Sequence, residues 1–190
     1  MSATRDLTPP PDAERPLTLE EFETLPGDDG WRSELVRGWL VREPPAGFEH
    51  GAIAARIIAR LGSFVERHGL GAVLSSETGF VLAEHPATVR GPDAAFVGRE
   101  RLPENPLGFA RLAPDLAVEV ASPSQSYRAV HDKALDYLDA GTRLVWVVEP
   151  TRRTVSVYRS RSDIRILGEG EVLEGGEVLP GLRLAVAELF

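Results

Sequence analysis

Residues 114–141 constrain the fold more than any other stretch of this sequence. They begin with a short apolar run, Leu116–Val120, whose length and β-branched residues predict a buried strand. This run carries one carboxylate, Glu119, and a charge in a buried strand needs a compensating partner. A Ser/Pro turn follows, and then a helical pattern that contains Lys133 and ends at Gly141. The stretch therefore predicts a strand–turn–helix unit that brings a buried acid near a lysine.

The predicted helix has two distinct faces at a period of 3.6 residues. The residues expected on its apolar face are Tyr127, Val130, Ala134, Tyr137 and Leu138, and those expected in solvent are Arg128, Asp132, Asp136 and Asp139. Lys133 falls beside the Tyr137 edge, where its amine can lean over the neighbouring strand. Residues 144–148 are continuously apolar, as in a central strand that is covered on both faces.

The remaining segments alternate between strand and helix patterns. Helices are predicted at 19–25, with Thr18 and Glu21 as a capping box, and at 50–68. Strands are predicted at 33–43 (two short strands or one kinked strand), 72–83, 94–97, 154–158 and 164–167, with a strand or short helix in 178–189. We expect one α/β domain with a mixed central β-sheet flanked by helices over residues 17–190. Residues 1–16 are polar and proline-rich, and we expect a disordered lead-in.

Composition excludes several classes of function. There is no cysteine, so disulfides and thiolate zinc sites are absent. No apolar run approaches the roughly 20 residues of a membrane span, and the polar N-terminus favours a cytoplasmic location. The net charge of −8 argues against nonspecific coating of nucleic acid, although an acidic nuclease site neutralised by a metal ion remains compatible with it. Lys133 is the only lysine in the chain.

Three acids lie on or near predicted strands: Asp93, Asp115 and Glu119. Asp115 and Glu119 are four residues apart in an extended segment, roughly 13 Å between backbones, so they cannot easily share one ion. Asp93 can lie on the strand beside Glu119, where facing positions are only roughly 5 Å apart. Asp93 and Glu119 are therefore the better pair, and such an oxygen site favours Mg²⁺ or Mn²⁺.

The order of these residues resembles the PD-(D/E)XK nuclease superfamily. An acid follows a proline at Asp93, a second acid lies on a buried strand at Glu119, and a lysine comes later. In the usual pattern the lysine stands two residues after the second acid, where this chain has Ala121, so Lys133 would have to replace it from the helix. The wider pattern is similar to the Uma-two family of restriction-endonuclease-like proteins. The matching pieces are ELVRG at 34–38, His50 at a helix start, GPDAAFV at 91–97, PDLAVEVASPS at 114–124, DKALDYLDAG at 132–141, WVVEP at 146–150 and PGLRL at 180–184.

This resemblance implies a restriction-endonuclease-like fold and hydrolysis of DNA phosphodiesters with Mg²⁺ or Mn²⁺. Asp93 and Glu119 would be the metal ligands, and Lys133 would assist the attacking water and stabilise the developing charge. Glu34 would complete the acidic cluster, directly or through water. Nucleases of this fold often cut two strands as symmetric dimers, so a homodimer is expected by analogy.

Several alternatives remain open. A purely structural Glu119–Lys133 salt bridge would explain both residues without a metal. The chain would then be a catalytically inactive module that keeps the fold and binds DNA or a protein partner, and a third alternative is a hydrolase of smaller phosphoesters. His50 fits helix capping or site support better than catalysis. Ser122 and Ser124 fit turn and N-cap positions better than nucleophiles, and the other histidines, His68, His85 and His131, are expected on the surface. Arg56, Arg60 and Arg67 are expected on a solvated helix face.

Overall fold

The computed structural model of the protein describes residues 15–25, 31–104, 107–122 and 125–190. Most of the expected lead-in, residues 1–14, lies outside these ranges, so the boundary between lead-in and domain stays a prediction. The described residues form a six-stranded mixed sheet, a four-stranded antiparallel sheet and a small strand pair, with helices packed on them. The predicted α/β architecture with a mixed central sheet is confirmed.

The central sheet has six strands in the order β10-β9-β8-β7-β6-β3. Their bounds are β3 Gly71–Ser75, β6 Ala94–Gly98, β7 Leu116–Val120, β8 Leu144–Glu149, β9 Thr154–Tyr158 and β10 Ile164–Leu167. Strand β7 is buried along its whole length, with β6 antiparallel on one side and β8 parallel on the other. Side chains on both of its faces pack in hydrophobic clusters, which explains why its sequence is an almost continuous apolar run.

A second, four-stranded antiparallel sheet has the order β2-β1-β5-β4. Its bounds are β1 Arg32–Val36, β2 Trp39–Glu43, β4 Phe80–Glu84 and β5 Ala87–Arg90. The turn between β1 and β2 has positive φ angles at Arg37 and Gly38, as a tight hairpin requires. A two-stranded pair, β11 Val172–Glu174 and β12 Arg183–Ala185, follows near the C-terminus.

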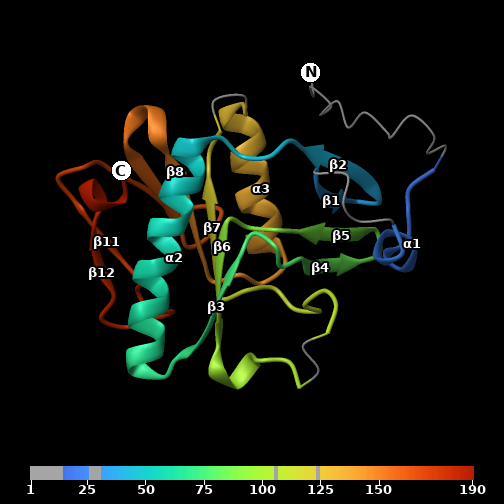
Figure 1. Ribbon diagram of the computed structural model, residues 1–190, viewed down its shortest axis with the longest axis horizontal. Coiled ribbons are helices and arrows are strands. Elements are labelled where there is room, and N and C mark those ends of the chain that lie inside the picture. The colour runs from blue at the N-terminus through green and yellow to red at the C-terminus, as the bar shows by residue number, and fades with distance from the viewer. Residues whose placement is uncertain (1–14, 26–30, 105–106, 123–124) are drawn as a thin grey trace.

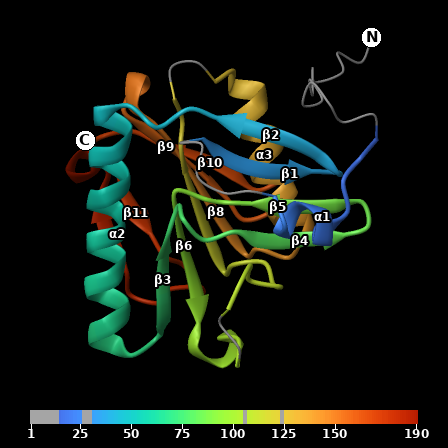
Figure 2. The same ribbon diagram turned by 45° about the vertical axis from the view of Figure 1, so that its right-hand side comes forward.

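Two long helices cover opposite faces of the central sheet (Figure 1). Helix α2, Phe48–His68, packs Ile53, Ile57, Leu61 and Val65 on one face, and helix α3, Tyr127–Asp139, packs Val130, Ala134 and Tyr137 on the other. The remaining helical elements are α1 Leu19–Glu23, η1 Arg99–Arg101, η2 Pro150–Arg152 and η3 Val186–Leu189. In Figure 2, α2 lies to the left of the central sheet and the four-stranded sheet lies to its right. None of the described helices is long and apolar enough to span a membrane.

Most predicted elements are confirmed, including the capping box of Thr18 and Glu21 on α1. The predicted strand at 72–83 was wrong as one element, because it divides into β3 and β4, which belong to different sheets. The polar Ser76 and Glu77 form a turn there, closed by the Thr78 N–H donating to the Ser75 carbonyl. Strands β5 and β11 were not predicted.

Two residues of α3 differ from the predicted helix faces. Tyr127, placed on the apolar face, is 58% exposed because it is the first residue of the helix. Asp136, placed in solvent, is half-buried and forms an ion pair with the buried Arg90. The N-cap of α3 is Ser126, whose hydroxyl accepts from the Ala129 N–H. Ser122 lies in the preceding turn, and Ser124 lies outside the described residues.

Candidate active site

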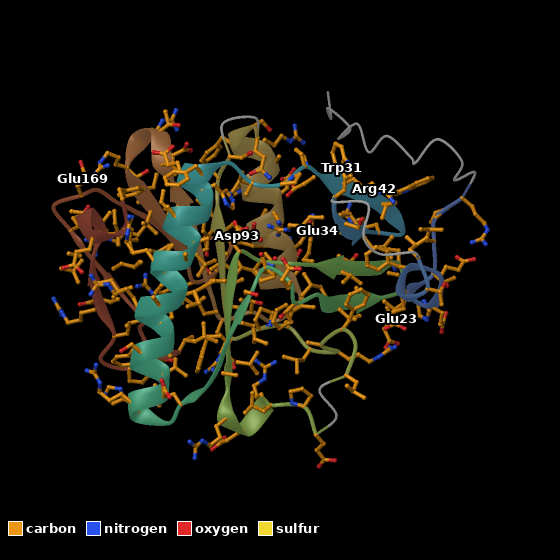
Figure 3. All side chains as sticks on the ribbon, in the orientation of Figure 1. Glu23, Trp31, Glu34, Arg42, Asp93 and Glu169 are labelled. Atoms are coloured by element: carbon orange, nitrogen blue, oxygen red, sulfur yellow. The ribbon has the colours of Figure 1, made fainter. Side chains whose placement is uncertain are left out.

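The fold brings all four predicted site residues together at one end of β7. Glu34 comes from β1, Asp93 immediately precedes β6, Glu119 is on β7, and Lys133 is on α3. Because Ala94 pairs with Val118 across the antiparallel β6–β7 ladder, Asp93 lies opposite Glu119 as the strand argument predicts. Figure 3 labels Glu34 and Asp93, which lie near each other at the centre of the molecule. All four side chains are almost fully buried.

Both oxygens of Glu119 are held by helix α3. Lys133 Nζ lies 2.8 Å from Oε2, and the Tyr137 hydroxyl donates to Oε1 at 2.8 Å. Lys133 and Tyr137 are four residues apart, so they project from the same face of the helix. Helix α3 therefore places an ammonium group beside Glu119, whereas the strand position two residues after Glu119 is Ala121.

Glu34 is the second carboxylate bound to Lys133. Its Oε1 lies 3.0 Å from Lys133 Nζ and accepts from the Gly91 N–H at 2.9 Å, while Oε2 lies 2.8 Å from Nη1 of the buried Arg90. Arg90 extends the network to Asp136 on α3. Glu34 is therefore fixed by two cations and one backbone amide.

Asp93 has a different set of partners. Its Oδ1 lies 2.8 Å from Arg32 Nη1, and its Oδ2 lies 3.2 Å from His50 Nε2 and accepts from the Val120 N–H at 2.8 Å. Arg32 also donates to the Gly91 carbonyl. The other ring nitrogen of His50, Nδ1, is buried with no hydrogen-bond partner among the described residues. His50 lies in the first turn of α2 but does not cap that helix, whose N-cap is Gly47. The expected capping role is therefore wrong, whereas the expected role in supporting the site agrees with the contact between His50 and Asp93 and stays a prediction.

A cleft of about 300 Å³ opens at this end of β7. Glu119, Asp93, Arg32 and His50 contribute to its wall, together with Gln125 from the turn before α3. Glu34 and Lys133 do not line this cleft and lie behind Glu119. Solvent and small ligands therefore reach the two predicted metal ligands first.

The charges of the cluster are unevenly compensated. Burial raises the pKa of Glu119, and the nearby Asp93 and Glu34 raise it further, while Lys133 offsets only part of this. Burial acts in the same direction on Glu34, but Lys133, Arg90 and the Gly91 N–H outweigh it and hold the pKa of Glu34 below its usual range. The pKa of Glu119 is raised instead of lowered because its partners are one ammonium, which it shares with Glu34, and one neutral hydroxyl. Its negative charge is therefore less well compensated than that of Glu34.

The donor set fits a Mg²⁺ or Mn²⁺ ion, although it does not form a closed metal site. Among the residues that the structure describes, no three His, Asp or Glu side chains are grouped to hold a metal. Mg²⁺ is usually bound by one or two carboxylates, with waters and substrate phosphates as its other ligands. Asp93 and Glu119 supply two such oxygens on one cleft wall, and Glu119 lacks a full countercharge. To bind there, an ion would have to displace some of the side chains that now bond to the oxygens of Asp93 and Glu119.

Four residues of this site were not predicted: Arg32, Arg90, Asp136 and Tyr137. A helical spacing of four from Lys133 is a signal that could have assigned Tyr137 to the site rather than only to the apolar face. The arginines carry no such signal, because their contacts span 61 residues for Arg32–Asp93 and 56 for Arg90–Glu34.

Asp115 lies apart from the site, as its distance along β7 predicts. Its oxygens accept from the Gly98 N–H and pair with Arg101 and Arg143. The other histidines are also outside the site. His68 and His85 are exposed, whereas His131 is half-buried and bonded through Nδ1 to the Tyr158 hydroxyl. Of the arginines expected on a solvated face of α2, Arg60 and Arg67 are exposed, and Arg60 pairs with the exposed Glu188. Arg56 differs, because it is half-buried and donates to the Leu189 carbonyl.

The comparisons with known proteins agree with this architecture. A family model named Uma2, described as "Putative restriction endonuclease", matches residues 19–187. The crystal structure of a protein described as a putative nuclease belonging to DUF820, from Anabaena variabilis ATCC 29413, is similar at a TM-score of 0.81 and 25% sequence identity. This match covers 92% of this chain and 98% of that chain. No curated relative matches the chain. The restriction-endonuclease-like fold expected from the sequence is confirmed.

Proposed function

The chain belongs to the Uma2 family, and we propose that it is a nuclease that hydrolyses DNA phosphodiester bonds with the help of a divalent metal ion. The observation that carries the proposal is the meeting of Asp93 and Glu119 on one cleft wall, with the ammonium of Lys133 directly behind Glu119. Burying charged groups costs several kcal/mol per ion. A cluster of three buried acids, the half-buried Asp136 and three buried or half-buried cations is therefore better explained by function than by stability.

Asp93 and Glu119 would hold Mg²⁺ or Mn²⁺. Such an ion, when bound, polarises the phosphate and lowers the pKa of a bound water. Lys133 is held in its charged form, because Glu119 and Glu34 outweigh the effect of burial and raise its pKa. It would therefore stabilise negative charge near the attacking water rather than remove its proton. Glu34 would keep this ammonium in place, and Arg90 would keep Glu34 in place.

Arg32 and His50 would contact the substrate phosphate from the cleft wall. Both side chains bind Asp93 and both line the cleft. The hydrogen bond to Asp93 raises the pKa of His50, which favours its positive form. An arginine and a protonated imidazole are suitable donors to phosphate oxygens.

One observation favours the alternative of an inactive module that binds DNA or a protein partner. All four carboxylate oxygens of Asp93 and Glu119 have partners within the protein. A fold that no longer binds metal would be expected to compensate its acids in this way. Metal binding therefore separates the two functions.

The test is isothermal titration of Mn²⁺ into the wild type and into an Asp93→Asn/Glu119→Gln double variant. We expect stoichiometric binding by the wild type and none by the double variant. Glu84→Gln, which removes an exposed acid outside the cleft, is the matched control and should bind like the wild type. A folded wild type, checked by circular dichroism, that binds no Mn²⁺ would exclude the metal-dependent reaction.

A homodimer and a cytoplasmic location remain predictions. Strands β3 and β10 are the two edge strands of the central sheet and offer unpaired backbone groups. Light scattering coupled to size-exclusion chromatography measures the oligomeric state directly. A monomer at every concentration would mean that the protein cuts one strand at a time, if it cuts DNA.

A further inference from the structure

A second hollow adjoins the cleft. It is an open trough of about 570 Å³ between α2, the start of β1 and the turn that follows β3. Five residues line both the cleft and the trough: Arg32, Pro45, Ala46, His50 and Asp93. The two hollows are therefore parts of one groove, and Asp93 lies where they join.

The walls of the trough differ from those of the cleft. Along α2 they include the small residues Gly51, Ala54 and Ala55, which let a ligand approach this part of the helix closely, and the larger Ile58. On the other side lies Trp31, whose large apolar side chain is 51% exposed. Glu77 is the one acid besides Asp93 in this lining. The trough thus combines a half-exposed indole ring with a nearly balanced charge.

We propose, on the basis of the nuclease function proposed above, that the trough binds the nucleotides of a single DNA strand on one side of the scissile phosphate, with one base stacked on Trp31. A phosphate bound by Arg32 and His50 would lie beside Asp93 at the junction, so a strand that continues in either direction would enter one of the two hollows. Aromatic side chains bind unpaired bases by stacking, in a largely sequence-independent way. The substrate is therefore a polynucleotide with unpaired bases at this position rather than a small phosphoester.

The charge of the groove determines how strongly salt should weaken the binding of a single strand. Arg32 is the permanently charged cation on its lining, beside the acids Glu43, Glu77, Asp93 and Glu119, so about one phosphate would be neutralised. For a single strand this gives a slope of log K against log salt of roughly −0.7. Binding that depends on stacking more than on phosphate contacts also agrees with the net charge of −8.

The experiment measures binding of a fluorescein-labelled 12-nucleotide single strand by fluorescence anisotropy in EDTA, which prevents cleavage. Trp31→Ala should weaken binding roughly 5- to 100-fold, from the usual contribution of one stacked base. Phe48→Ala is the matched control, because Phe48 is 94% exposed at the start of α2 but lines neither hollow. Trp31→Phe should restore most of the affinity, since it keeps an aromatic ring.

A second pair of variants tests the trough itself. Ala55→Leu narrows the trough and should weaken binding of the 12-nucleotide strand at least 5-fold. Ala59→Leu, one helical turn later, is exposed on α2 outside the lining and should leave the affinity unchanged. Equal affinities for the wild type, Trp31→Ala and Ala55→Leu would overturn the proposal, as would no binding of the strand by the wild type.

Hydrolysis of bis(4-nitrophenyl) phosphate with Mn²⁺ separates this proposal from the proposed function, because so small a diester does not need the trough. If the wild type cleaves neither this diester nor DNA but Trp31→Ala still weakens strand binding, the nuclease function fails and the binding site stands. If the wild type cleaves the small diester as efficiently as oligonucleotides of 2 to 12 residues, the polynucleotide assignment fails and the hydrolase function stands.

Discussion

The ammonium of Lys133 lies 2.8 Å from Oε2 of Glu119, in a region where both side chains are almost fully buried. The same ammonium lies 3.0 Å from Oε1 of Glu34, so one cation is shared by two buried carboxylates. Removal of this cation leaves negative charge without compensation in a region of low dielectric. This shared ion pair has consequences for both stability and activity, and they can be measured separately.

We expect Lys133→Met to lower the free energy of unfolding by about 3 to 5 kcal/mol, the usual cost of breaking a buried ion pair. Adding Glu119→Gln should recover part of this loss, because it removes one of the two carboxylates that lost their cation. Urea denaturation of the single and double variants measures both quantities. If the double variant is no more stable than Lys133→Met, then Glu119 does not depend on Lys133 in the folded protein.

In activity, unlike in stability, the second substitution should recover nothing. Under the proposed function, Lys133→Met lowers kcat by roughly 10²- to 10³-fold, as removal of one group that stabilises transition-state charge commonly does. The double variant should remain inactive although it is more stable, because it lacks a metal ligand as well. A double variant that regains activity together with stability would show that Lys133 serves only the fold.

Tyr137→Phe should lower the free energy of unfolding by about 1 to 3 kcal/mol. The change removes the hydroxyl that donates to Oε1 of Glu119 and leaves a buried carboxylate oxygen without this partner. Tyr158→Phe is the matched comparison, since that hydroxyl bonds to the half-buried His131 rather than to a carboxylate. Its loss should be smaller, and an equal loss would mean that the charge on Glu119 does not strengthen its hydrogen bond with Tyr137.

Asp115 should give the fold a measurable dependence on pH. Its burial acts to raise its pKa, but the Gly98 N–H, Arg101 and Arg143 outweigh burial and hold the pKa below the usual value. The ionised group therefore stabilises the fold above the unfolded pKa of about 3.9, and this stabilisation is lost as the pH falls below that value.

Asp115→Asn tests this dependence. The variant should be less stable than the wild type by about 2 kcal/mol at pH 7, because hydrogen bonds to a charged group are replaced by weaker ones. The difference should shrink as the pH falls from about 5 to about 3, through the unfolded pKa of about 3.9. Melting temperatures across this range provide the measurement, and a difference that does not vary with pH would contradict the assigned ionisation.

The strand β7 and helix α3 were predictable because their patterns are local. The apolar run of β7 and the 3.6 periodicity of α3 depend on neighbours within the segment, and Asp93 could be paired with Glu119 because adjacent strands restrict which residues face each other. Arg32 and Arg90 were not predictable, because their partners depend on how the four-stranded sheet docks beside the central sheet. The division of 72–83 was missed for a similar reason: its two halves belong to different sheets, and only the turn at Ser76 and Glu77 marks the break.

Two glycines should respond in opposite ways to substitution by alanine. Gly71 on β3 has φ of +153°, and an added Cβ would lie 2.1 Å from the Val97 carbonyl oxygen in the neighbouring strand. Gly71→Ala should therefore lower the free energy of unfolding by about 2 kcal/mol or more, since backbone rather than a flexible side chain must move. Gly62 lies inside α2, and an added Cβ there would meet nothing within 4 Å.

Gly62→Ala should raise the free energy of unfolding by about 0.5 to 1 kcal/mol, because alanine restricts the unfolded chain and favours the helix. Both variants are measured by urea denaturation with the wild type as reference. Opposite signs would show that β3 packs against β6 as closely as the backbone positions indicate. If Gly71→Ala were as stable as the wild type, the edge of the central sheet would have to relax away from Val97, and with it the turn at Ser76 and Glu77 that forms one wall of the proposed strand-binding trough.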